Sequence, residues 1–244
     1  MLEAAWWGFV GGAALLLGAA VGVWVKVPTR LIGLVLGFGA GVLFSAVAFE
    51  LTVDAFQTGG VGPLVGGLLA GALAFFVGDA WLDHRGAHHR KCPDGPPAGA
   101  AASALVLGAL LDGIPESAAV GLTLADGGGV GIAVVAAVFL SNVPESLSSA
   151  SGMLAAGRSR ARILLLWGGV TLAGTVSAAL GYSLLGGAGA SVVAGTQAFA
   201  AGAILTMLAD TMLPEAAEHG GREAGLVTVL GFATAFLVST ATMV

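Results

Sequence analysis

Two apolar segments of the chain carry acidic residues at a spacing that suits metal binding. Asp112 and Glu116 lie four residues apart, so they share one face if the segment is helical. Ser141 and Glu145 repeat this spacing on the next apolar segment, where Asn142 adds an amide oxygen. Neither segment contains a lysine or an arginine. Three carboxylates crowded in a low-dielectric environment would repel one another or take up protons unless a cation joined them. The residue types therefore indicate a site for a divalent cation.

A proline precedes each glutamate in two matching hexapeptides, DGIPES at residues 112–117 and SNVPES at residues 141–146. Inside a helix, Pro115 and Pro144 would each remove one backbone hydrogen bond and crowd the carbonyl four residues earlier. A carbonyl freed in an apolar environment needs water, a neighbouring helix or an ion as its partner. We therefore expect two kinked helices that form an oxygen-rich pocket.

Other interpretations of the same residues stay open. Each carboxyl group could be protonated and hydrogen-bonded between helices, in a purely structural role. The carboxylates could also form a proton relay, as in a proton-coupled carrier of another solute. An intramembrane hydrolase would use the pair as acid and base, but no basic residue that could recognise a phosphate or a lipid lies near them. We therefore expect no enzymatic activity.

The composition indicates a membrane protein. Of the 244 residues, 57% are hydrophobic and only 9% are charged, with a mean hydropathy of +0.97, whereas soluble domains carry about 25% charged residues. A membrane helix needs about 20 apolar residues. We predict an all-α polytopic membrane protein with one domain, residues 1–244, and eight transmembrane helices. The predicted helices are residues 4–25, 31–53, 61–82, 100–124, 130–152, 163–185, 192–214 and 224–243.

Basic residues lie only in alternate loops between these segments. The nine are Lys26, Arg30, Arg85, Arg90, Lys91, Arg158, Arg160, Arg162 and Arg222. The positive-inside rule therefore puts these loops in the cytoplasm and both termini outside. The longest of them, residues 83–99, also carries His84, His88 and His89. These histidines could bind metal weakly, for capture or regulation, or they could simply be polar residues of a disordered loop.

The chain contains an internal repeat. Residues 37–54 align with residues 198–215, and the two hexapeptides form a second pair. In the predicted topology each pair lies on helices that run in opposite directions. This pattern predicts an inverted repeat of three helices, two central helices and three helices, an organisation typical of secondary transporters. A simpler explanation, that a composition rich in glycine, alanine and leucine matches itself, accounts for much of the first pair but hardly for the second.

The motifs resemble those of the ZIP family of divalent-metal transporters. That family carries an H-N-x-P-E-G element on its fourth helix and a P-E-G or P-H-E element on its fifth, where this chain has residues 112–117 and 141–146. Residues 37–51 resemble the family's second helix, and residues 199–219 resemble its seventh. The resemblance covers nearly the whole chain, and the fourth and fifth helices are its specific part.

The resemblance implies a set of oxygen ligands for a metal, comprising Asp112, Glu116 and Glu145, helped by Asn142 or Ser141. Asp112 replaces the family's usual histidine on the fourth helix, and Gly174 takes the place of a glutamate on the sixth in the best alignment. The family's two-metal centre would therefore lose ligands of its second site, which predicts one main metal position. Replacing histidine by aspartate disfavours manganese and ferrous iron less than zinc.

The function implied by the resemblance is transport of a divalent metal toward the cytoplasm, with zinc favoured, manganese and iron next, and cadmium as a further candidate. The first, fourth, fifth and sixth helices would carry the ion and slide against the other four. Asp210 aligns with a polar position on the family's seventh helix, and Glu50 and Asp54 align with its second. We interpret these three residues as part of a pathway for the ion.

The expected surroundings follow from these predictions. The partners are the lipid bilayer and divalent metal ions, with no nucleic acid, and the transported metal takes the place of a prosthetic group. Glycine-rich helices can pack within one chain or between two, so a homodimer is an open alternative. The expected location is the cell membrane, as a multi-pass protein of the bacterial plasma membrane.

Overall fold

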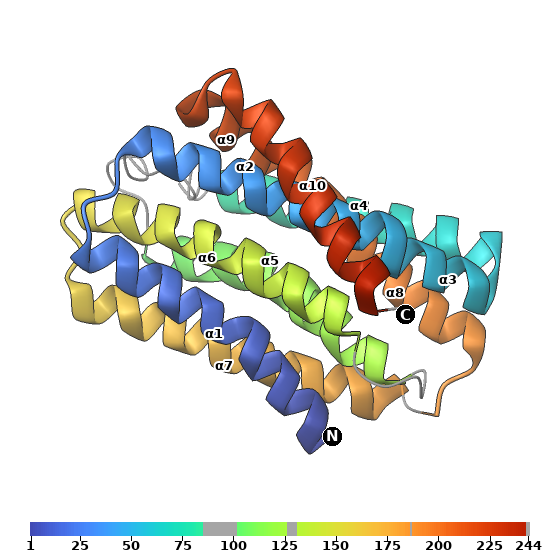
Figure 1. The fold of residues 1–244 in the computed structure, drawn as a ribbon. Coiled ribbons are helices and arrows are strands. Elements are labelled where there is room, and N and C mark those ends of the chain that lie inside the picture. The colour runs from blue at the N-terminus through green and yellow to red at the C-terminus, as the bar shows by residue number, and fades with distance from the viewer. Residues whose placement is uncertain (85–101, 126–130, 186, 243–244) are drawn as a thin grey trace.

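The computed structural model describes residues 1–84, 102–125, 131–185 and 187–242, and these residues form long helices (Figure 1). In this part of the chain, eight helical spans are long and apolar enough to cross a membrane, which confirms the predicted number. The spans are α1 (Leu2–Trp24), the continuous run of α2 (Thr29–Ala46), η1 (Val47–Leu51) and α3 (Thr52–Gly59), then α4 (Val61–Leu82), α5 (Ala102–Ala125), α6 (Ile132–Ala155), α7 (Arg160–Leu185), the continuous run of α8 (Ala190–Met207), η3 (Leu208–Met212) and α9 (Leu213–Gly220), and α10 (Glu223–Thr242).

The second and seventh spans are longer than predicted. Their predicted ends, residues 53 and 214, fall short because each helical run continues through polar residues to a glycine turn. Hydropathy marks a helix end where polar residues begin, whereas backbone hydrogen bonding does not depend on side-chain polarity. Gly60 and Gly221 follow the two runs with φ angles of 74° and 67°, in the left-handed region that favours glycine.

These two runs have the same three-part build. Each consists of an 18-residue α-helix, a 5-residue π-helix and an 8-residue α-helix. The alignment of residues 37–54 with residues 198–215 places the two π-helices at the same positions. This match supports the internal repeat for the two runs. The arrangement of three, two and three helices over the whole chain stays a prediction.

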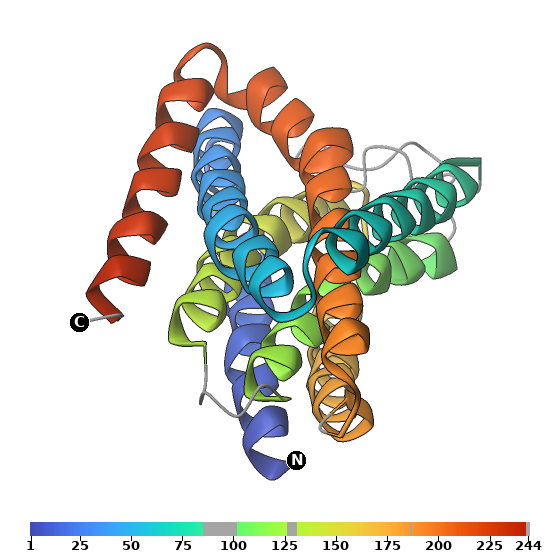
Figure 2. The same ribbon diagram turned by 90° about the vertical axis from the view of Figure 1, so that its right-hand side faces the viewer.

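The helices pack as two bundles. In the first bundle, α1 packs along α6 and α7, and α5 packs along α7. In the second bundle, α10 packs along the α2 run and α4 packs along the α8 run. Figure 2 shows α10 beside α2 on one side of the second bundle and α4 beside α8 on the other. The two hexapeptides therefore belong to the first bundle, and the two π-helices belong to the second.

Glycines let the helices of the second bundle approach through their backbones. A Cβ atom on Gly71 of α4 would overlap the carbonyl oxygen of Phe199 on α8, and a Cβ atom on Gly231 of α10 would overlap that of Phe38 on α2. Phe38 and Phe199 are aligned residues of the repeat, so both crossings use the same contact. Small residues provide this close packing in a bilayer, where the hydrophobic effect does not drive helices together.

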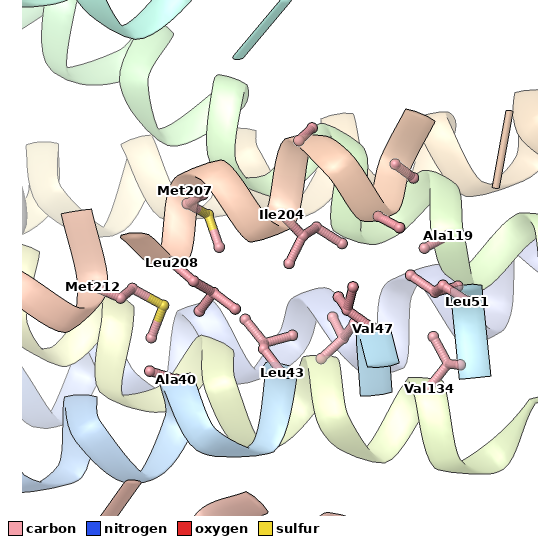
Figure 3. Close-up of a cluster of buried hydrophobic side chains, with 14 of the residues drawn as sticks. Ala40, Leu43, Val47, Leu51, Ala119, Val134, Ile204, Met207, Leu208 and Met212 are labelled. Carbon is pink, nitrogen blue, oxygen red and sulfur yellow. The ribbon is translucent and has the colours of Figure 1, made fainter. Parts of the chain in front are cut away.

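An apolar core joins the two bundles (Figure 3). The second bundle contributes aliphatic and methionine side chains from the α2 and α8 runs, and the first contributes Ala119 of α5 and Val134 of α6. The labelled side chains on the second bundle are Ala40, Leu43, Val47, Leu51, Ile204, Met207, Leu208 and Met212. All of these are at most 2% exposed. The two bundles thus meet through a surface of apolar side chains.

The described basic loops and the chain ends lie at opposite ends of the molecule (Figure 1). The α1–α2, α6–α7 and α9–α10 loops, which contain Lys26, Arg158 and Arg222, lie at one end, and α1 starts and α10 finishes at the other. At the basic end, Arg30 at the start of α2 donates a hydrogen bond of 2.8 Å to Glu223 at the start of α10. The separation agrees with the predicted alternation of the loops, while the outward orientation of the termini stays a prediction.

The glycine contact between α4 and α8 can be tested with Gly71→Ala. The added methyl group would overlap the Phe199 backbone, so we expect a loss of about 1–3 kcal/mol of stability, as for an overpacked core. Thermal unfolding of the detergent-purified protein measures this. Gly66→Ala is the matched control, because it lies on the same helix and has no atom within 4 Å of the added methyl group. Equal unfolding temperatures for the two variants would contradict the assigned role of the contact.

Candidate metal centre

The five predicted ligands are all buried in the first bundle. Asp112 and Glu116 lie on α5 and are 2% and 1% exposed, and Ser141, Asn142 and Glu145 lie on α6 and are 0%, 3% and 3% exposed. Both helices pack against α1. Since charged residues are almost never fully buried without a compensating partner, their burial agrees with the expectation of a polar site inside the bundle.

The proline segment of α6 lies between glycines of two neighbouring helices. On one side, a Cβ atom on Gly39 of α2 would lie 2.8 Å from Cγ of Pro144 and 3.2 Å from Cα of Ser141. On the other side, a Cβ atom on Gly18 of α1 would overlap the carbonyl oxygen of Val143. Any larger side chain at either glycine would push α6 away. The two glycines therefore set the position of the segment that carries the α6 ligands.

Asn142 is the ligand candidate whose orientation is best defined. Its Nδ2 donates a hydrogen bond of 3.0 Å to the carbonyl oxygen of Gly11 on α1. A carbonyl oxygen can only accept, so this bond assigns the two ends of the amide. The opposite atom, Oδ1, is buried and receives no hydrogen bond from the described residues. A buried amide oxygen that is held in place and has no donor is well suited to coordinate a cation.

The hydroxyl group of Ser141 is oriented differently. Its Oγ donates a hydrogen bond of 3.0 Å to the carbonyl oxygen of Val138, one turn earlier on the same helix. Ser146 does the same toward the carbonyl oxygen of Asn142, over 2.7 Å. The bond made by Ser141 uses its proton and leaves its oxygen lone pairs available to a metal. Of the two α6 residues that could assist the carboxylates, Asn142 is the stronger candidate, because its buried amide oxygen receives no hydrogen bond from the described residues.

Gly174 on α7, where the ZIP pattern has a glutamate, lies against α5. A Cβ atom at this position would be 2.5 Å from Oγ of Ser117, which is itself buried. A glutamate could not occupy this position without displacing Ser117. Gly174 replaces the family's glutamate, and Ser117 replaces the glycine that ends the family's fourth-helix element. The two departures complement each other, because Ser117 fills the space beside Gly174.

Hydrogen bonds from side chains to backbone carbonyls connect the helices of the first bundle. Besides the bond from Asn142 to α1, Thr171 of α7 donates to the carbonyl oxygen of Gly12 on α1, over 2.9 Å. Ser177 of α7 donates to that of Ile114 on α5, over 3.3 Å. The helices that carry the candidate ligands are thus bonded to α1 or α7 of their own bundle.

The predicted pathway residues belong to the second bundle. Asp210 on η3 is exposed, whereas Glu50 on η1 and Asp54 on α3 are half-buried. Glu50 accepts a hydrogen bond from the hydroxyl group of Ser239 on α10. His84 follows α4 and is exposed. The two other predicted residues, His88 and His89, lie outside the described residues.

Among the described residues, the structure brings together a group of potential metal ligands that we did not predict, on α9. Glu215, Glu218 and His219 on α9 offer metal-binding atoms that lie within 4.8 Å of one another. Their spacing of three and four residues puts them on one helix face. This signal is present in the sequence, but the three residues follow residue 214, the predicted end of the seventh span.

Known relatives of the chain are zinc transporters of bacteria, although no family model matches it. Zinc transporter ZupT from Enterobacter sp. (strain 638) is 31% identical over 218 residues, which cover 86% of this chain and 84% of that protein. Zinc transporters ZupT from Salmonella paratyphi A and Salmonella newport (strain SL254) are each 31% identical over 220 residues, with the same coverage. Together with its eight spans, these relatives identify the chain as a multi-pass protein of the plasma membrane. The similarity extends over most of both sequences, so the chain belongs to the ZIP family of divalent-metal transporters.

Proposed function

We propose that the chain carries a divalent transition metal, with zinc as the first candidate, toward the cytoplasm through a site between α5 and α6. The ligands in this proposal are Asp112, Glu116, Asn142 and Glu145, with a smaller contribution from Ser141. The names of the relatives, which are zinc transporters, support the substrate. The direction and the location of the site are our inferences from the charge pattern and the buried residues.

The observation that carries the proposal is the orientation of Asn142. Leaving a buried acceptor without a donor costs about 1–3 kcal/mol, yet α1 holds the amide so that its oxygen receives no hydrogen bond from the described residues. Three buried carboxyl groups lie on α5 and α6, which contain no lysine or arginine. A divalent cation would satisfy the amide oxygen and the carboxylates together.

The donor set determines which metals the site would accept. All of the proposed ligands are oxygen atoms, which zinc accepts and which manganese and ferrous iron also bind well. Cadmium is a further candidate substrate. Position 174 on α7, where the family has an additional glutamate, is a glycine packed against Ser117. This supports one main metal position in place of two.

The packing also supports movement of the first bundle as a unit. Hydrogen bonds connect its helices internally, whereas an apolar core lies between the bundles (Figure 3). Apolar contacts are not directional, which suits movement of one surface over the other. In this proposal the ion stays with α5 and α6 while the first bundle moves past the second.

Removing one carboxylate should abolish most of the transport. We expect Glu116→Gln and Glu145→Gln each to reduce zinc uptake by liposomes loaded with a zinc-sensitive dye. The reduction should exceed about tenfold. Losing an outer-shell partner of a metal ligand already costs about 10–100-fold, and these residues are proposed as the ligands themselves. Glu3→Gln is the control, because Glu3 is exposed near the N-terminus. Parental uptake by both test variants would refute the site. Proton flux that does not depend on metal would favour the proton-coupled carrier.

The role of Asn142 can be separated from that of its neighbour. Asn142→Leu should remove the stabilisation against heat that zinc or manganese gives the purified protein, because the amide oxygen is lost. Asn142→Asp should keep it, since an oxygen remains at the same position. Ser141→Ala should have a smaller effect, because the carboxylates and the buried amide oxygen of Asn142 remain. Full metal stabilisation of Asn142→Leu would exclude the amide as a ligand.

The absence of histidine from the site predicts how its selectivity can be changed. Asp112→His adds an imidazole nitrogen, which suits zinc better than manganese. We expect the ratio of zinc affinity to manganese affinity to rise about tenfold, equivalent to 1.4 kcal/mol, in competition binding to the detergent-purified protein. Asp112→Asn, which keeps an oxygen ligand but removes the charge, should weaken both metals. An unchanged ratio in Asp112→His would place residue 112 outside the coordination sphere.

A further inference from the structure

A second group of potential metal ligands lies on α9, at the basic end of the molecule. Glu215, Glu218 and His219 each offer a ligand atom, and these atoms lie within 4.8 Å of one another. Imidazole nitrogen and carboxylate oxygen are both ligand types that zinc accepts. None of these residues lies on α5 or α6, so the group is separate from the candidate centre.

The histidine and one glutamate of this group are held inside the protein. The side chains of His219 and Glu215 are only 7% and 6% exposed, with Nδ1 of the histidine 3.3 Å from Oε2 of the glutamate. The same Nδ1 lies 3.0 Å from the carbonyl oxygen of Glu215. When Nδ1 donates to this carbonyl, Nε2 keeps the lone pair that a metal needs, and metal-binding histidines commonly make such a bond. Glu218 is exposed, so the group opens toward solvent.

The surrounding structure holds this turn of α9 in place. The helix ends at Gly220, where the backbone packs so closely that a Cβ atom on Gly33 of α2 would overlap Gly220. Just beyond the turn, Arg30 and Glu223 tie the start of α2 to the start of α10 over 2.8 Å. The ligands therefore lie on a helix end that is fixed against its neighbour, which reduces the cost of ordering them around an ion.

The repeat provides an internal comparison. α3 has the same length as α9 and follows the same π-helix, but Asp54, Gln57 and Thr58 occupy the positions of the three ligands. The corresponding helix α3, at the other end of the molecule, therefore forms without a histidine and with only one carboxylate at these positions. The fold therefore does not require the combination of ligands found on α9.

We propose that Glu215, Glu218 and His219 form a second divalent-metal site at the basic end, which binds zinc or a metal of similar chemistry. His219 and Glu215 supply the buried ligands, Glu218 supplies a ligand from the exposed side, and water completes the coordination. The open side allows exchange of the ion with solvent. Binding at this site does not depend on the proposed transport activity.

The test uses the small number of histidines in the chain. Of the four, three lie at positions 84, 88 and 89, so the full-length variant His84→Gln/His88→Gln/His89→Gln retains His219 alone. Zinc-edge X-ray absorption of this zinc-loaded variant should show imidazole bound to zinc. Adding His219→Thr, the residue found at the equivalent position of α3, should remove the imidazole signal and lower the zinc retained in equilibrium dialysis by one ion per chain. Zinc without imidazole in the triple variant, or unchanged retention after His219→Thr, would refute the site.

Two further variants keep the result interpretable. Glu218→Gln changes an exposed residue, so it should weaken zinc binding at this site without affecting folding, and unchanged zinc affinity would count against the proposal.

Glu145→Gln in the triple-glutamine background should keep the imidazole signal, because it changes only the α5–α6 centre. If Glu145→Gln transports zinc normally while the imidazole signal persists, the proposed transport site fails and the α9 site stands. If the signal disappears with Glu145→Gln, the α9 site is not independent and this proposal fails.

Discussion

The cost of burying carboxyl groups in an apolar bundle governs the rest of this structure. Placing one charged side chain at the centre of a membrane helix costs about 2.5–3.5 kcal/mol, and this chain places three carboxyl groups on α5 and α6 without any lysine or arginine there. In the proposed site, a divalent cation would compensate for this cost. Polar groups of α1, α6 and α7 that are bonded to one another, together with a held amide oxygen, provide surroundings in which a cation completes the balance.

Glycine makes these surroundings possible. Gly18 and Gly39 let α1 and α2 approach the proline segment of α6 from two sides, and Gly174 lets α7 approach Ser117 of α5. Close backbone packing excludes lipid from the polar residues and compensates for the weak association of apolar helices in a bilayer. The two bundles use this device differently. The first combines it with hydrogen bonds to carbonyl groups, and the second relies on the repeated crossings at Gly71 and Gly231.

The sequence predicted the features that depend on transfer of residues from water to lipid. It predicted the eight spans and the burial of Asp112, Glu116 and Glu145, because hydropathy and charge report that transfer directly. It did not predict the π-helices or the full length of the second and seventh spans, which depend on backbone hydrogen bonds. It could not rank Asn142 above Ser141, because the rotamers and the bonds to Gly11 and Val138 decide their roles. The sequence did not predict the candidate ligands on α9, because the predicted seventh span ends at residue 214 and the helical run continues to Gly220.

In the proposed function, the two hexapeptides would form a single site from a duplicated framework. Both carry the same P-E-S element, but Asp112 on α5 corresponds to Ser141 on α6, and Gly113 corresponds to Asn142. The duplication thus supplies two prolines and two glutamates, while the third carboxylate and the amide each come from one helix only. Three ionised carboxylates around a divalent cation would leave one negative charge in the bundle. A neutral assembly needs one proton as well as the metal, so metal and protons compete for the same oxygen atoms. In the proposed site, metal transport and a proton relay would therefore use the same group of residues, and the relative affinity of the carboxylates for the metal and for protons would decide between them.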